Sequence, residues 1–165
     1  MEKMNPETMQ DIINVQEGRG KDKKKIKNFQ SEVETKIYRN DKDKVCFPVG
    51  GFKKAIVEAA PYLDGMDKKL AKSIIIVGDL VEIKYSKQTV NKAIGRQSGI
   101  TKAPRPIWRP EFSNWSCELE IRFNSKMITA EQVIGLIKLA GFHIGVGGWR
   151  PQCGGQYGMF AVKLN

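Results

Sequence analysis

The chain has 165 residues, of which 41% are hydrophobic and 28% are charged, and these values fit one globular domain with a substantial core. No run approaches the roughly 18 apolar residues of a membrane span, and the N-terminus lacks the apolar stretch of an export signal, so the sequence predicts a cytoplasmic protein. The formal net charge of +10 attracts polyanions; a basic surface that serves only solubility is the alternative.

Residues 1–30 predict an arm outside the folded domain, which we place at residues 31–165. The stretch at 19–27 reads RGKDKKKIK and holds six basic residues and one acidic residue. Such runs are usually solvated. We therefore expect a disordered arm, which either stays inert or also touches a polyanion.

The first half of the domain predicts short strands around one helix. Alternation at 32–38 and the apolar residues at 45–48 indicate strands, and Gly50-Gly51 opens a helix that Pro61 ends or bends. One face of that helix is apolar, formed by Phe52, Ile56, Ala59, Ala60 and Leu63. Gly78-Asp79, between apolar runs, predicts either a tight hairpin or one long bulged strand.

The second half contains the clearest strand and helix. Residues 115–123 alternate between apolar and polar, which predicts a strand with one wet face and makes Cys117 a small buried hydrophobe. Thr129 and Gln132 form a capping box at the start of the next helix. Gly141 is expected to end this helix as a left-handed residue, with Phe142 folding back on its last turn and short strands at 142–146 and 159–164.

This order of elements predicts an α+β fold of the ferredoxin-like type, βαββαβ, with two main helices and a glycine-rich loop before the last strand. The helices would cover one face of an antiparallel sheet. The other face would be open to a ligand.

A basic segment at 84–110 is expected to be a long mobile loop. It holds seven basic residues and no acidic residue up to position 109: Lys84, Lys87, Lys92, Arg96, Lys102, Arg105 and Arg109. Trp108 adds an aromatic plane to this charge, a combination that single-strand binding favours. The alternative is an ordinary solvated loop with Trp108 packed on the core.

The glycine-rich segment GVGGWRPQCGGQYG at 145–158 is the second candidate binding element. Its glycines allow positive φ and close approach to a phosphate, and Trp149 and Arg150 place a stacking plane beside a cation. It lacks both the G-K-[ST] of a P-loop and a following helix. A structural hairpin with a bulky tip is the alternative.

Catalytic and metal centres are not indicated. His143 is the only histidine, and no Ser, Cys or acid pair is spaced to assist it. Cys46, Cys117 and Cys153 are too far apart for a zinc ribbon or a redox pair. The sequence therefore predicts a protein that is not an enzyme and carries no cofactor.

The segment FPVGGFKKAIVEAA at 47–60, taken with GVGGWRPQCGGQYGMF at 145–160, resembles the RAMP superfamily of CRISPR effector complexes. The resemblance implies ferredoxin-like domains that bind RNA through the first helix, the glycine-rich loop and a basic insertion. Gly51, Phe52, Lys53 and Lys54 match the first motif. Gly145, Gly147, Trp149 and Arg150 match the second. The chain is shorter than most backbone subunits, so the family's cleavage roles are not carried over, and a compact relative from a phage or other mobile element would fit.

These features lead to one principal hypothesis, non-catalytic binding of RNA or single-stranded DNA by a basic, aromatic-bearing surface. Its expected residues are Lys53, Lys54, Lys92, Arg96, Lys102, Arg105, Trp108, Arg109, Gly147, Trp149 and Arg150. We also expect that the chain can form a homo-oligomer or join a larger nucleoprotein complex, and that it does not bind a membrane. The main alternative is a protein-interaction or self-assembly module, including one that inhibits a nucleic-acid machine. A metal-free ribonuclease that uses His143 is a third hypothesis.

Overall fold

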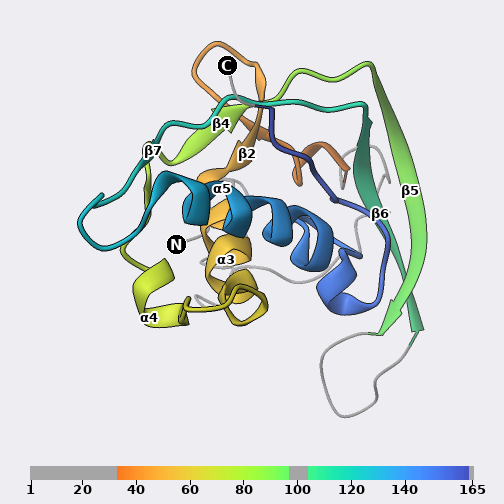
Figure 1. Ribbon diagram of the computed structural model, residues 1–165. Helices are drawn as coiled ribbons and strands as arrows, with labels where there is room; N and C mark the ends of the chain where they lie inside the picture. Colours follow the sequence, from red (N-terminus) through yellow and green to blue (C-terminus); the bar gives the residue numbers. More distant parts are fainter. Residues whose placement is uncertain (1–32, 97–103, 164–165) are drawn as a thin grey trace, which may run out of the picture. The chain divides into compact units, whose positions relative to one another are not determined.

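The computed structural model describes residues 33–96 and 104–163 (Figure 1). The chain divides into two compact units, one made of residues 1–38 and 85–115 and the other of residues 39–84 and 116–165. The sequence analysis expected one domain over 31–165, whereas the segment at 85–115 separates from the rest. The predicted arm at 1–30 lies outside the described residues.

The larger unit contains the two expected main helices. Helix α3 (Val49–Ala59) buries the predicted stripe, including Phe52, Ile56 and Ala59, and passes into a short 3₁₀ helix, η1 (Ala60–Tyr62), at Pro61. Helix α5 (Ala130–Leu139) begins at the predicted capping box, in which the Thr129 hydroxyl accepts from the Gln132 backbone and the Gln132 side chain accepts from the Thr129 backbone. Both helix predictions are confirmed.

A third helix, α4 (Lys68–Ala71), is one turn long and is capped by Asp67, whose carboxylate accepts from the Leu70 backbone at 2.6 Å. Helices α3, α4 and α5 pack around a common apolar core (Figure 1). The largest fully buried side chains of this core are Ile56, Ile74, Ile128 and Leu136.

The strands of this unit form small antiparallel sheets. Strand β2 (Val45–Pro48) pairs with β4 (Leu80–Glu82), with β1 (Tyr38–Arg39) on its other edge, and β3 (Ile75–Ile76) pairs with β7 (Ile121–Arg122). Since β3 and β4 have different partners, the sequence at Gly78 forms neither the predicted hairpin nor one bulged strand. The class is α+β, and the ferredoxin-like order stays a prediction.

The predicted strand at 115–123 keeps its alternation but little of its pairing. Odd-numbered residues are half-buried and even-numbered ones exposed throughout. The segment pairs only at an isolated bridge between Lys84 and Ser116 and at β7. Cys117 is therefore half-buried, whereas Cys46 on β2 is the buried thiol.

The end of α5 differs from the prediction. Instead of stopping at Gly141, the chain continues through a π-helical turn, η2 (Ala140–Ile144), and the residue with positive φ is Gly145. The Phe160 carbonyl approaches Gly141 so closely that a Cβ there would clash. Phe142 is 64% exposed and does not fold back, and the expected strands at 142–146 and 159–164 are absent from the part of each segment that the structure describes.

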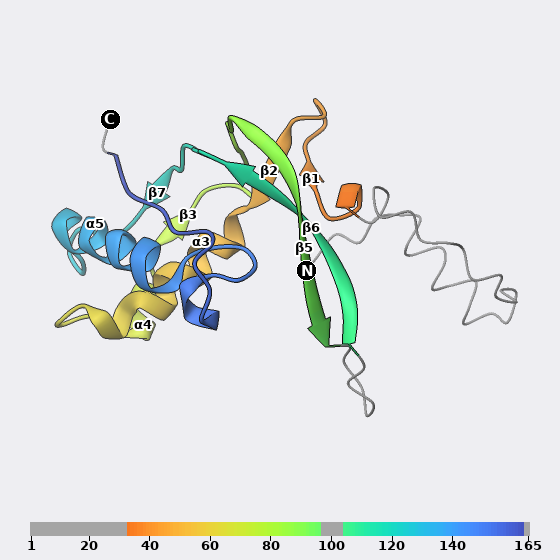
Figure 2. The same cartoon turned by 90° about the vertical axis from the view of Figure 1, so that its right-hand side faces the viewer.

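The smaller unit is built on a long antiparallel hairpin, formed by β5 (Lys87–Arg96) and β6 (Pro104–Ser113). Figure 2 shows it as a twisted two-stranded ribbon. A loop was expected over 84–110, yet most of this segment is strand, and residues 97–103 lie outside the described chain. Pro104, Pro106 and Pro110 occupy alternate positions of β6, so the backbone nitrogens of all three can lie on the edge away from β5. On that edge of a strand, the missing N–H of a proline interrupts no hydrogen bond of the ladder.

The predicted strand at 32–38 is mostly a turn. The backbone N–H of Lys36 donates to the Val33 carbonyl and that of Ile37 to the Glu34 carbonyl, both at 3.1 Å. Only Tyr38 belongs to a strand.

Candidate nucleic-acid interface

The β5–β6 hairpin sorts its side chains onto two faces. Residues that pair across an antiparallel ladder share a face, and the register pairs Lys92 with Trp108 and Asn91 with Arg109. Trp108 and Arg109 therefore lie on opposite faces, although the sequence analysis grouped them. Each face carries basic residues, but in different surroundings.

The first face carries a cation–π pair. The Lys92 ammonium lies 4.8 Å from the centre of the Trp108 ring, and Lys92 itself is exposed. On the outer edge of the same strand, the Lys36 ammonium donates to the Trp108 carbonyl at 2.6 Å. Trp108 thus contacts two cations, and the Lys92 ammonium already covers one side of the indole ring. This geometry favours a role for Trp108 in orienting Lys92 over the base stacking that was expected of Trp108.

The second face is polar. The Asn91 amide donates to a Glu111 carboxylate oxygen at 2.9 Å, and Arg109 pairs with Asn91 in the ladder. Arg109 is half-buried. Arg96 and Arg105 belong to the paired strands but their side chains lie outside the description, and Lys102 falls in the segment at 97–103.

In the larger unit, Lys53 has a structural task. Its ammonium donates to the backbone carbonyls of Lys72 at 2.7 Å and Ala71 at 3.3 Å, and also to that of Ile74. These three acceptors use all the donors of an ammonium group, and burial lowers the pKa of Lys53. A binding role of Lys53 stays a prediction; in the structure its ammonium contacts the carbonyls at the end of α4, while Lys54 is exposed.

The glycine-rich loop brings together Gly147, Trp149 and Arg150. Its base is closed by a hydrogen bond from the Val146 N–H to the Gly158 carbonyl, and its middle by one from the Tyr157 N–H to the Trp149 carbonyl. The Trp149 carbonyl crowds Gly155 and the Val146 carbonyl crowds Gly158, so neither glycine has room for a Cβ. The close approach of the two sides of the loop makes it a preformed support.

Two side chains of this loop are presented for contact. Trp149 has a φ of +54°, unusual outside glycine, and is 53% exposed. The Arg150 guanidinium donates to the Gly147 carbonyl at 3.0 Å and to the Gln152 side chain at 2.9 Å and 3.2 Å. The loop therefore fixes a cation next to an exposed indole. These candidates and the hairpin belong to different units, so each surface is considered by itself.

The His143 ring contacts two other aromatic rings. Its ring stacks on Tyr62, with centroids 4.6 Å apart and planes within 1°, and Phe142 meets it edge-on at 5.1 Å. The sequence analysis missed this aromatic cluster. Tyr62 lies far from Phe142 and His143 in the chain, so no local sequence pattern points to this cluster.

No helix within residues 33–96 and 104–163 has the length and apolar character of a membrane span. Over the same ranges, no three His, Cys, Asp or Glu side chains gather as metal ligands would. Comparisons with protein-family models, with curated proteins and with solved structures give no significant match. The resemblance to the RAMP superfamily therefore rests on the two sequence motifs.

Proposed function

We propose that this chain binds RNA or single-stranded DNA, without catalysis, through the β5–β6 hairpin and the glycine-rich loop. The observation that carries the proposal is the Lys92–Trp108 pair on a long ribbon rich in basic residues. Lys92 and Arg109 supply cations to phosphates from the two faces of the hairpin. The stacking role belongs to Trp149, because its indole is exposed and its backbone is held by the crowded loop.

The test is fluorescence anisotropy with labelled single-stranded RNA and DNA over a series of salt concentrations. Replacing Lys92 and Arg109 with glutamine removes two phosphate contacts, which should flatten the log–log salt slope by about 1.4 for a single strand. Trp149→Leu should lower affinity with little change of slope, because it removes a plane and no charge. Lys42→Gln, in the exposed turn before β2, is the control for the loss of one charge outside the hairpin.

The proposal would be refuted if the parent protein bound neither the RNA nor the DNA probe at low salt. Equal slopes for the parent, the hairpin variant and Lys42→Gln would refute the role of the hairpin.

One observation favours a second function, self-assembly or docking on another protein. Ile94 is 81% exposed on β5, and Val90, four residues before it on the same face, is also exposed. Exposed aliphatic residues on an edge strand are a common route to association between chains. Ile94→Ser should convert such an oligomer to a monomer in light scattering, whereas nucleic-acid binding as proposed leaves the mass of the free protein unchanged by this substitution.

A further inference from the structure

Three aromatic rings meet on the surface of the larger unit. Tyr62 comes from η1, and Phe142 and His143 come from the π-helical turn η2. Tyr62 is 56% exposed and Phe142 is 64% exposed, while His143 is half-buried between them. Large rings usually pack inward, and π-helical turns are often found at functional sites, so this cluster calls for an explanation beyond packing.

The geometry leaves one side of Tyr62 open. His143 covers one face of the phenol ring in a parallel stack, and Tyr62 is 56% exposed, so we take the opposite face as the side open to a ligand. A flat ring placed on the open face would continue the stack. Nucleic-acid bases are the common biological groups of that shape, and they stack on aromatic side chains without regard to sequence.

Lysines surround the neighbouring turn of α3. Glu58 lies four residues before Tyr62, about 6 Å along a helix axis. The Lys68 ammonium donates to its carboxylate at 2.7 Å. This hydrogen bond is the main cause that holds the pKa of Glu58 below its usual range. Lys54 lies four residues before Glu58 on α3, and Lys72 lies four residues after Lys68 at the end of α4, so helical spacing places each on the same side as its partner in this ion pair.

Three cations around one carboxylate leave a positive surface beside the aromatic rings. We propose that this surface, the α3–α4 platform, binds one nucleotide of a single-stranded polynucleotide. The platform consists of Tyr62, Phe142, His143, Lys54, Lys68 and Lys72. The base stacks on the open face of Tyr62, and the flanking phosphates lie along the lysines.

A single strand fits better than a duplex or an acidic protein. A paired base in a duplex has both faces covered by its neighbours, so it cannot stack on Tyr62 unless it leaves the helix. An acidic peptide would satisfy the lysines but supplies no regular series of flat rings next to its charges. The inference rests on the proposed function for the kind of ligand, but it concerns residues of one unit, of which only Lys54 was expected from the sequence.

The experiment compares three probes of about ten nucleotides each. They are oligothymidylate DNA, oligouridylate RNA and an abasic oligomer with the same number of phosphates, each labelled for anisotropy. Tyr62→Leu should weaken binding of the base-bearing probes about 5- to 20-fold and leave the abasic probe unchanged. Tyr62→Phe keeps the ring and should bind within about twofold of the parent. The DNA and RNA arms show which strand is preferred.

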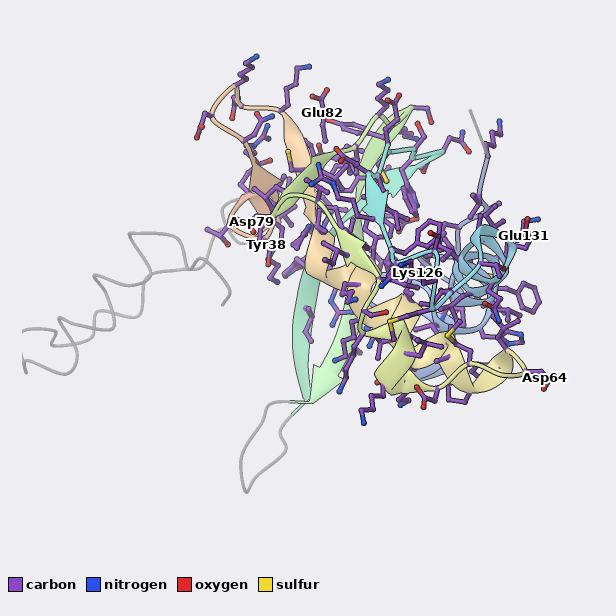
Figure 3. All side chains as sticks on the ribbon, turned by 60° about the vertical axis from the view of Figure 1, so that its left-hand side comes forward. Tyr38, Asp64, Asp79, Glu82, Lys126 and Glu131 are labelled. Carbon is purple, nitrogen blue, oxygen red and sulfur yellow. The ribbon has the colours of Figure 1, made fainter. Side chains whose placement is uncertain are left out.

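The lysines are tested separately. Replacing Lys54 and Lys72 with glutamine should weaken binding of all three probes and flatten the salt slope by about 1.4. Lys42→Gln is the control, because it removes one charge from the turn before β2. Figure 3 shows that Asp64, two residues after Tyr62, and Glu82, which pairs with Lys44 at the end of that turn, lie at opposite sides of the molecule.

Each outcome decides between the two proposals when the hairpin variant is measured alongside. If the hairpin variant binds weakly while Tyr62→Leu and the lysine pair bind like the parent, the platform is refuted and the proposed function stands. If the platform variants bind weakly and the hairpin variant does not, the hairpin role is refuted and the platform stands. Loss of the abasic probe along with the others in Tyr62→Leu would refute base stacking, and a parent that binds no probe refutes both.

Discussion

Lys53 and Lys54 are adjacent on α3, and their expected roles are opposite. Lys53→Met keeps the aliphatic stem but removes every donor to the carbonyls of Ala71, Lys72 and Ile74. A hydrogen bond from a charged group contributes about 1.5–3 kcal/mol. The three bonds share one cation, and the half-buried site lets water reach the freed carbonyls, so we expect a loss of about 2 kcal/mol in the free energy of unfolding, not the sum of three bonds.

Urea denaturation followed by circular dichroism measures this loss. Lys54→Met is the matched control: its side chain is exposed, and its replacement should change stability by less than about 0.5 kcal/mol. The two substitutions should have the opposite effects on nucleic-acid binding. Lys54→Met should weaken the affinity, and folded Lys53→Met should leave it unchanged. Equal stability of Lys53→Met and the parent, or equal destabilisation by both substitutions, would show that the carbonyl contacts of Lys53 do not hold α4.

Three further predictions concern the packing and the helix ends, and thermal or urea denaturation tests them. Cys46→Ala should destabilise the fold by about 1–2 kcal/mol and Cys117→Ala by less, because only Cys46 is buried; the reverse order would contradict the assignment of β2 to the core. Thr129→Ala should cost about 1 kcal/mol by removing the capping box at α5, and a neutral effect would show that the cap is replaced by solvent. Gly141→Ala should destabilise the fold strongly, because a Cβ would clash with the Phe160 carbonyl. Gly50, at the start of α3, has open space around it, so Gly50→Ala should be neutral or stabilising by up to about 1 kcal/mol. Similar effects at both glycines would refute the close approach at Gly141.

Local signals were enough to predict the two main helices, α3 and α5. The apolar stripe of α3 and the capping box of α5 involve residues within one or two helical turns, so the pattern and the structure report the same interactions. The alternation at 115–123 was equally local and holds for burial. The same alternation could not predict the pairing, because a long ladder needs a partner strand of matching length. This segment pairs only with the short strand β3 and at the single bridge to Lys84.

The hairpin and the binding surfaces depended on contacts that sequence spacing does not reveal. Glycine and proline in the segment at 84–110 indicated a loop, yet the prolines of β6 fall on alternate positions that an edge strand tolerates. Lys53 and Lys54 looked alike because the carbonyls that hold Lys53 come from residues 18 to 21 positions later in the chain. The Tyr62–His143 stack joins residues far apart in the sequence, so no local pattern indicates it.

The division into two units alters what nucleic-acid binding requires of this chain. A single continuous surface, as the sequence suggested, would need the units to be held in one arrangement. A single strand removes that requirement, because it can contact the hairpin with one part of its length and the glycine-rich loop or the α3–α4 platform with another. Once one contact forms, the strand raises the local concentration of phosphates and bases at the other, so two weak surfaces give a stronger combined affinity than either alone. The cations and exposed rings of each unit therefore need to be only locally organised, and that is the level at which the Lys92–Trp108 pair, the crowded glycine-rich loop and the Tyr62–His143 stack are built.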